Sequence, residues 1–153
     1  MKAHTGRLLF RASILCLILP ASSSAQDSRE SANQVWTQMQ GVYADIGQDK
    51  KFDLHNYTIS RMDGGGRDRW RFELSANREY VVTAACDRNC SDTDLYIKSP
   101  GGKIVAMDEG EDDRPTVLFI PEQSGRYTFE VRMDRCGEDP CYVGLGLFGK
   151  SDR

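Results

Sequence analysis

The chain has 153 residues, with 20 Lys and Arg against 23 Asp and Glu, and a formal net charge of −3. A chain of this length fits a single domain and can bury a sizeable hydrophobic core. Its acidic balance disfavours a general surface for nucleic acid or for an anionic membrane.

The first 25 residues are typical of a secretory signal peptide. A basic start is followed by the apolar run 14–19 and by the small residues 21–25, which predict cleavage after Ala25. The apolar run is far shorter than the roughly 20 residues that cross a bilayer. We therefore expect a periplasmic or secreted protein with no membrane span, in which residues 26–153 carry 17 of the 20 basic side chains and all 23 acidic ones.

Four cysteines remain beyond residue 25, and an even number in an exported domain predicts disulfides. We favour the pairs Cys86–Cys90 and Cys136–Cys141, because each pair brackets a short polar loop. The main alternative is two long-range bridges between these loops, which would stabilise more because they close longer segments. A zinc site is disfavoured by the loose cysteine spacing and by an oxidising compartment.

Residues 26–50 form an N-terminal segment with a helical pattern. The apolar residues that recur at helical steps are Val35, Met39, Val42 and Ile46. They predict an amphipathic helix from about residue 31 to residue 46, which we expect to cover an open end or edge of a β-domain. The alternative is that Trp36 and Tyr43, one heptad apart, form a stripe that binds a partner.

From residue 51 to about residue 150 the pattern changes to short strands separated by turns. Residues 67–74 and 126–133 alternate between apolar and polar side chains, and the glycine-rich segments 63–66 and 99–102 predict turns. About eight such strands at regular spacing indicate an all-β fold. We expect an antiparallel β-sandwich or jelly roll with one N-terminal α-helix.

The alternation also assigns faces to the strands. It places Trp70, Phe72, Tyr127 and Phe129 toward the core. The arginines between them, Arg67, Arg69 and Arg71, then form a basic face on the other side of the sheet. We expect acidic residues of neighbouring strands to lie beside these arginines in solvent; the alternative is that the face docks an acidic partner.

The central part of the chain carries several short motifs of a secreted sandwich. They are the strand WRFEL at 70–74, the segment SDTDLYI at 91–97, the turn PGG at 100–102 and the segment SGRYTFEV at 124–131. With these motifs, residues 67–148 resemble the bacterial pre-peptidase C-terminal domain family. The resemblance implies a β-sandwich, and some members of that family bind Ca²⁺ or the polymer that their protease degrades. The cysteine pairs are not a general feature of the family.

Carboxylates gather at two points that a hairpin would bring together. If residues 94–98 pair with 103–107 through the turn between them, Asp94 and Asp108 emerge at the same end of the hairpin. Hard cations such as Ca²⁺ bind about six to eight oxygens of this kind. The alternative is that the carboxylates project into solvent or cap turns. The candidate Ca²⁺ ligands are Asp92, Asp94, Asp108, Glu109, Glu111, Asp112 and Asp113.

Catalysis is disfavoured by the residue types present. Beyond residue 25 the only histidine is His55, and the sequence has no nucleophile elbow and no phosphate-binding glycine loop. We expect a non-catalytic module for interaction or stability, with an envelope or extracellular protein or polysaccharide as its partner. The alternatives are a polysaccharide- or protein-binding module that uses exposed tyrosines, or a small hydrolase built on a carboxylate pair. The candidate binding tyrosines are Tyr57, Tyr96 and Tyr142.

Overall fold

The computed structural model describes residues 23–50 and 52–151, and the side chains of residues 27–46 and 52–151. Most of the predicted signal segment therefore lies outside the described residues. The elements are α1 (Ser23–Lys50), β1 (Phe52–Met62), β2 (Arg67–Leu74), β3 (Tyr80–Cys86), β4 (Cys90–Lys98), β5 (Ile104–Asp108), β6 (Thr116–Phe119), β7 (Gly125–Cys136) and β8 (Cys141–Lys150). None of the described helical residues forms a segment long and apolar enough to span a membrane.

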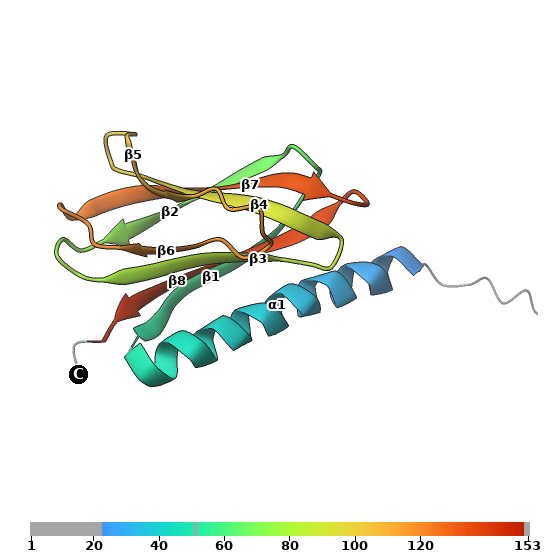
Figure 1. Cartoon of the computed structure of the whole chain (residues 1–153), viewed down its shortest axis with the longest axis horizontal. Coiled ribbons are helices and arrows are strands. Elements are labelled where there is room, and N and C mark those ends of the chain that lie inside the picture. Colours follow the sequence, from blue (N-terminus) through green and yellow to red (C-terminus); the bar gives the residue numbers. More distant parts are fainter. Residues whose placement is uncertain (1–22, 51, 152–153) are drawn as a thin grey trace, which may run out of the picture.

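The eight strands form two four-stranded antiparallel sheets, which confirms the predicted fold class. The strand orders are β1-β8-β3-β6 and β2-β7-β4-β5. Figure 1 shows three layers, in which α1 lies against the first sheet and the second sheet lies on the far side of the first. The strands that end the two sheets, β5 and β6, lie near each other along one side of the sandwich.

The core lies between the two sheets and is built by the inward residues of each strand. The residues predicted to face inward do so: Tyr127 and Phe129 are 2% and 0% exposed, and Trp70 and Phe72 on β2 pack partly buried against the same core. The Trp70 and Phe72 side chains are less covered because β2 ends its sheet. Other buried members of the core are Val82, Ala84, Leu95, Ile97, Val131, Val143, Leu145 and Leu147.

The helix covers the face of a sheet, so the expectation that it covers an open end or edge is wrong. It packs on β8, β1 and β3, and Val35 and Met39 are 0% and 2% exposed. The glycines of β8 explain why this face accepts a helix. A Cβ on Gly144 would lie 2.6 Å from Cγ1 of Val35, and one on Gly146 would lie 3.0 Å from Sδ of Met39. Without those side chains, the helix can approach the sheet closely.

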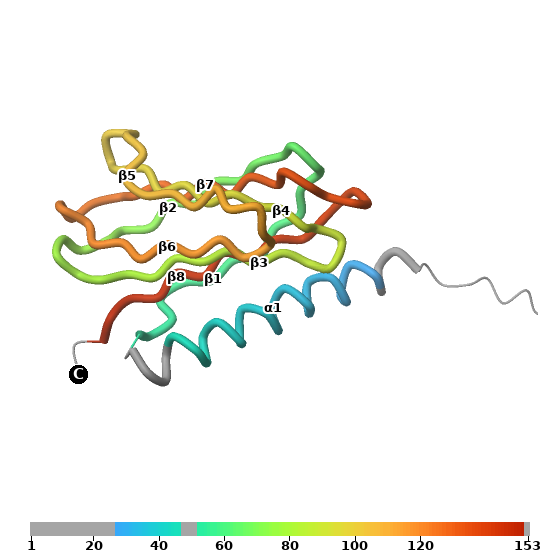
Figure 2. Tube along the Cα trace, viewed as in Figure 1, coloured from blue at the N-terminus to red at the C-terminus, as the bar shows by residue number. Residues whose placement is uncertain are grey.

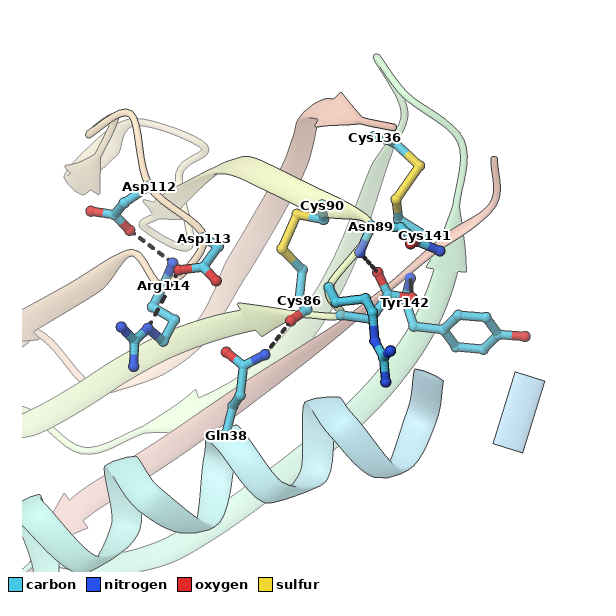
Figure 3. The surroundings of a disulfide bond; sticks show 12 residues. Gln38, Cys86, Asn89, Cys90, Asp112, Asp113, Arg114, Cys136, Cys141 and Tyr142 are labelled. Carbon is cyan, nitrogen blue, oxygen red and sulfur yellow. Dashed lines mark hydrogen bonds and ion pairs between the residues drawn. A yellow bond between two sulfur atoms is a disulfide. The ribbon is translucent and has the colours of Figure 1, made fainter. Parts of the chain in front are cut away.

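Both disulfides link neighbouring cysteines, as the sequence favours: Cys86 bonds to Cys90 and Cys136 bonds to Cys141. The first lies where β3 turns into β4, and the second joins the end of β7 to the start of β8. Figure 3 shows Gln38 of α1 reaching this region, where its Nε2 donates to the Cys86 carbonyl at 2.6 Å. The helix is therefore tied to the disulfide-bonded turn as well as packed on the sheet.

Candidate binding face

The outer face of the β2-β7-β4-β5 sheet carries a group of cations that we call the basic face. The helix packs on the other sheet, and the arginines of β2 are exposed. The pairing places Arg69 of β2, Glu130 of β7 and Tyr96 of β4 in one row across the sheet. The cations of the basic face are Arg67, Arg69, Arg71, Lys98, Arg126 and Arg132, and its carboxylates are Glu73, Asp94 and Glu130.

Glu130 lies at the centre of the basic face and its side chain is 0% exposed. Its carboxylate accepts hydrogen bonds from Arg69 Nε at 2.5 Å, Lys98 Nζ at 2.8 Å and Arg132 Nε at 3.0 Å. Burial raises the pKa of Glu130, but the hydrogen bonds from Lys98, Arg69 and Arg132 outweigh that effect and lower the pKa to about 2. One buried carboxylate therefore holds cations from three strands in fixed positions.

Tyr96 lies beside this network and is 3% exposed, so the prediction that it is an exposed tyrosine is wrong. Its hydroxyl contacts the Asp94 carboxylate at 2.9 Å and also Glu109, and it accepts a hydrogen bond from Arg132 Nη1 at 3.1 Å. The Arg132 guanidinium stacks 4.1 Å from the ring centroid. Burial raises the pKa of Tyr96, and the hydrogen bonds to Glu109 and Asp94 add to the rise. Tyr96 therefore helps to fix the position of the Arg132 side chain.

The carboxylates of Asp94 and Glu109 both contact the Tyr96 hydroxyl, which can donate only one hydrogen bond at a time. Burial raises the pKa of Asp94, and the hydrogen bond from Tyr96 lowers it. Nearby charges of Asp134, Glu109 and Asp92 raise it further. The sequence predicted that Asp94 and Asp108 lie at the same end of the β4-β5 hairpin, and they do. Leu95 pairs with Asp108, so Asp94 is one residue away from that pair along β4.

The other predicted calcium ligands already have partners inside the protein. Asp108 accepts hydrogen bonds from the backbone N–H groups of Gly110 and Thr116, at 3.1 and 2.8 Å. The remaining carboxylates pair with arginines or cap the loop: Asp112 caps the backbone N–H of Arg114, Asp113 pairs with Arg114, and Asp92 and Glu111 pair with Arg135. Figure 3 shows Asp112, Asp113 and Arg114 in this loop.

Within the described part of the chain, no group of three or more His, Cys, Asp or Glu side chains has an arrangement that could hold a metal ion. The acidic loop instead bonds to the sheet through its backbone, since Thr93 N donates to the Asp112 carbonyl at 3.0 Å. The Ca²⁺ site therefore stays a prediction that a binding measurement must test.

A second candidate surface is a groove of about 350 Å³ between α1 and β1. Trp36 and Tyr57 meet edge to face with ring centroids 4.8 Å apart, and Tyr43 stacks on Phe148 at 6.0 Å. The Tyr57 hydroxyl has no hydrogen-bond partner, and burial raises the pKa of Tyr57 to about 12. Trp36 and Tyr43 are 40% and 45% exposed. Trp36 and Tyr43 therefore pack against the sheet with one side of their rings and leave the other side exposed, where a partner could bind as the sequence alternative predicts.

The binding roles predicted for Tyr57 and Tyr142 stay predictions. Tyr142 is half-buried in β8, and its backbone N–H donates to the buried carboxylate of Asp87 at 3.2 Å. Sequence reasoning missed the roles of Glu130 and Asp87. A signal existed for Glu130, because the alternation of β7 places it on the same side of the sheet as the arginines of β2, but only the strand pairing shows that it lies directly opposite Arg69.

Comparison with known proteins finds similarity among solved structures. No protein-family model matches this chain, and no curated protein does. Among solved structures, the chain is similar to PliG of Aeromonas hydrophila, a periplasmic lysozyme inhibitor of g-type lysozyme. The two are 13% identical over 62% of this chain and 85% of that chain, with a TM-score of 0.47. Nothing about the partner of this chain follows from that likeness, and the resemblance to the pre-peptidase C-terminal domain stays a prediction.

Proposed function

We propose that this protein is an exported, non-catalytic binding module whose basic face docks an acidic surface on a partner protein. The observation that carries the proposal is the cluster of cations that Glu130 holds in place on the sheet face that α1 leaves uncovered. The two disulfides support an exported protein, because such bonds persist in oxidising compartments.

The cations are held before any partner arrives, which lowers the entropic cost of binding. Arg69 and Arg132 are fixed on Glu130 and still 46% and 35% exposed. Arg67 and Arg71, on either side of Arg69 along β2, are exposed. Guanidinium groups bind carboxylates through two parallel hydrogen bonds, so an array of this kind favours Asp and Glu side chains.

The contrast in charge between this face and the chain supports a specific dock. The chain carries a net charge of −3, whereas the strands of the basic face hold six cations and three carboxylates, and a fourth carboxylate, that of Glu109, lies beside Tyr96. Such a patch orients an acidic partner during encounter, and the negative remainder of the molecule repels wrong orientations. A glycan platform fits less well, because the aromatic ring on this face, that of Tyr96, is buried under Arg132.

The proposal is tested by titrating the exported protein with a glutamate-rich peptide and measuring the dissociation constant at several salt concentrations. We expect measurable binding that weakens as salt rises, because the contacts are between exposed charges. Arg67→Glu combined with Arg71→Glu should weaken binding by roughly tenfold or more, since like charges then face each other.

The matched control is Arg29→Glu combined with Arg61→Glu, which reverses two exposed arginines on α1 and β1, away from the basic face, and so changes the net charge by the same amount. It should leave the dissociation constant close to that of the unchanged protein. Equal losses in the control and in the β2 variant would mean that net charge, and not the basic face, governs binding. Binding of an acidic polysaccharide such as polygalacturonate in place of the peptide would assign the face to a polymer partner and overturn the proposal for a protein.

A further inference from the structure

The side of the sandwich formed by β5 and β6 exposes a group of large apolar side chains that the basic face does not use. Each of these strands ends its sheet, and the two contact each other. Figure 2 shows the two strands along one side of the molecule. Most of the exposed large apolar residues of the described chain lie on or beside them: Ile104, Val105, Met107, Leu118 and Ile120.

The backbone of β6 shows which of its groups face away from the sheet. Ala84 N donates to the Pro115 carbonyl at 3.0 Å, and Val82 pairs with Val117 in the antiparallel register. Because hydrogen-bonding direction alternates along an antiparallel strand, Val117 and Phe119 bond to β3. Leu118 then points both its N–H and its C=O outward, and its side chain is 62% exposed. Such an unpaired edge is a template for another strand.

We propose that a second copy of this chain pairs with β6 in antiparallel orientation, about a two-fold axis at Leu118. Leu118 then exchanges both backbone hydrogen bonds with Leu118 of the second copy. The same register sets Val117 against Phe119, and it sets Thr116, whose N–H already donates to the Asp108 carboxylate at 2.8 Å, against Ile120. The two four-stranded sheets join into one continuous sheet, and the exposed apolar residues of β6 are covered.

Charge complementarity supports a second copy as the occupant. In this register Arg114 lies opposite Glu122 of the second copy, and symmetry makes the same pair a second time. Both side chains are exposed in the single chain, where Arg114 also pairs with Asp113 at 3.4 Å. Pro115 and Pro121 fall at positions whose backbone faces inward, since their carbonyls accept from Ala84 N and Asn77 N, so the N–H groups that they lack are not ones that the second copy would bond. A two-fold contact of this kind closes on itself and forms a dimer, not a fibre.

The dimer has a consequence for the rest of the molecule. A two-fold axis between antiparallel strands of one sheet stands perpendicular to that sheet, so each face of the second copy points the same way as its equivalent. Both basic faces would then lie on one side of the dimer and both helices on the other. The dimer itself rests only on the β6 edge and does not depend on what the basic face binds.

The test is the molar mass of the exported protein, measured by sedimentation over a wide range of concentrations. We expect a concentration-dependent dimer. Leu118→Glu should lower the association constant by roughly tenfold or more, because it places two carboxylates at the axis. Leu54→Glu, which changes another exposed apolar residue on β1, is the control and should leave the dimer intact.

A second set of variants tests the proposed pair between Arg114 of one copy and Glu122 of the other. Glu122→Arg should weaken the dimer because it faces Arg114, and the double variant Arg114→Glu with Glu122→Arg should restore it. A protein that stays monomeric at every concentration would overturn the proposal. So would a dimer that is indifferent to both Leu118→Glu and Glu122→Arg, because another surface would then make the contact.

Discussion

At the scale of single residues, Glu130 decides how the basic face is organised. A carboxylate with no solvent exposure would be costly if it stood alone, and three cations from three strands compensate it. The same bonds fix the positions of Arg69 and Arg132, although the two positive charges repel each other. A buried acid therefore organises a surface whose charge is positive.

Replacing Glu130 with Gln should destabilise the fold at neutral pH. Breaking a buried ion pair costs about 3–5 kcal/mol, and because the three cations are partly exposed we expect a loss of about 2 kcal/mol. The free energy of unfolding, measured by urea denaturation, checks this value. Glu73→Gln removes an exposed partner of Arg126 on the same sheet and should change the stability little.

The pH dependence of stability follows from the lowered pKa of Glu130. Since the folded-state pKa of about 2 lies below the ordinary value of 4.5, the stabilisation is present above about pH 4.5 and is lost as the pH falls toward 2. We expect the unchanged protein to lose stability in this window more steeply than Glu130→Gln does. Parallel curves for the two proteins would show that Glu130 does not titrate in this way.

Asp94 should behave in the opposite sense, because burial raises its pKa above the ordinary value of 3.8. Its contribution to stability is present below that pH and is lost as the pH rises through the folded-state pKa. Asp94→Asn, which resembles the protonated acid, should therefore raise the melting temperature at pH 7 in EDTA. The gain should vanish in acid, where Asp94 is protonated in both states. A lower melting temperature at pH 7 would contradict this.

The predicted Ca²⁺ site is tested by the same melting experiment with millimolar Ca²⁺ in place of EDTA. A ligand that binds only the folded state stabilises it by about 2.7 kcal/mol at a hundredfold excess over its dissociation constant. We expect a clear rise in melting temperature that Asp94→Asn or Asp108→Asn abolishes. No rise would leave the acidic loop with the internal capping and pairing roles described above.

At the scale of elements, the position of α1 depends on the glycines of β8. Gly144→Ala should cost about 1–3 kcal/mol of unfolding free energy, because its Cβ meets Val35 at 2.6 Å and the helix must shift. Gly41→Ala is the matched control, because no atom lies within 4 Å of a Cβ added to that exposed helical glycine. It should stabilise the helix by roughly 0.5–1 kcal/mol. Equal effects of the two substitutions would contradict close packing at Gly144.

Sequence patterns predict most of the elements and fewer of their contacts. Alternation in β2 and β7 predicts which side chains face the core, and short spacing predicts the two disulfides. The periodicity of α1 identifies Val35 and Met39 as its packing side, but it does not say what they pack against. That information lies in Gly144 and Gly146, about a hundred residues further along, and becomes readable only when β8 is placed under the helix.

The candidate site could be predicted less well, because its chemistry depends on the pairing of strands. The arginines of β2 are visible as a basic row in the sequence, whereas the role of Glu130 requires β7 to lie between β2 and β4. Tyr96 shows the same limit. Tyr96 alternates with the apolar Leu95 and Ile97 and shares its face with charged residues, so it looks exposed, yet β7 and the loop after β5 bring Arg132 and Glu109 over it. Long-range pairing, and not local pattern, determines these environments.

At the scale of the whole molecule, the two outer faces of the sandwich differ in what they expose. One is covered by α1 through small residues and an apolar stripe, which leaves the aromatic groove along β1. The other exposes cations fixed around a buried acid. Because the helix shields one sheet, the sheet face opposite the helix is open, and we propose that this face binds an acidic partner.

The most direct test of this binding is to map which backbone amide signals shift when a glutamate-rich peptide is added to isotopically labelled protein. We expect shifts concentrated on β2, β7 and β4, around Arg69, Glu130 and Lys98, and we expect them to disappear in the variant that carries Arg67→Glu and Arg71→Glu. Shifts concentrated around Trp36 and Tyr43 in the helix groove, or along β5 and β6, would contradict the proposal, as would the absence of any shift at low salt.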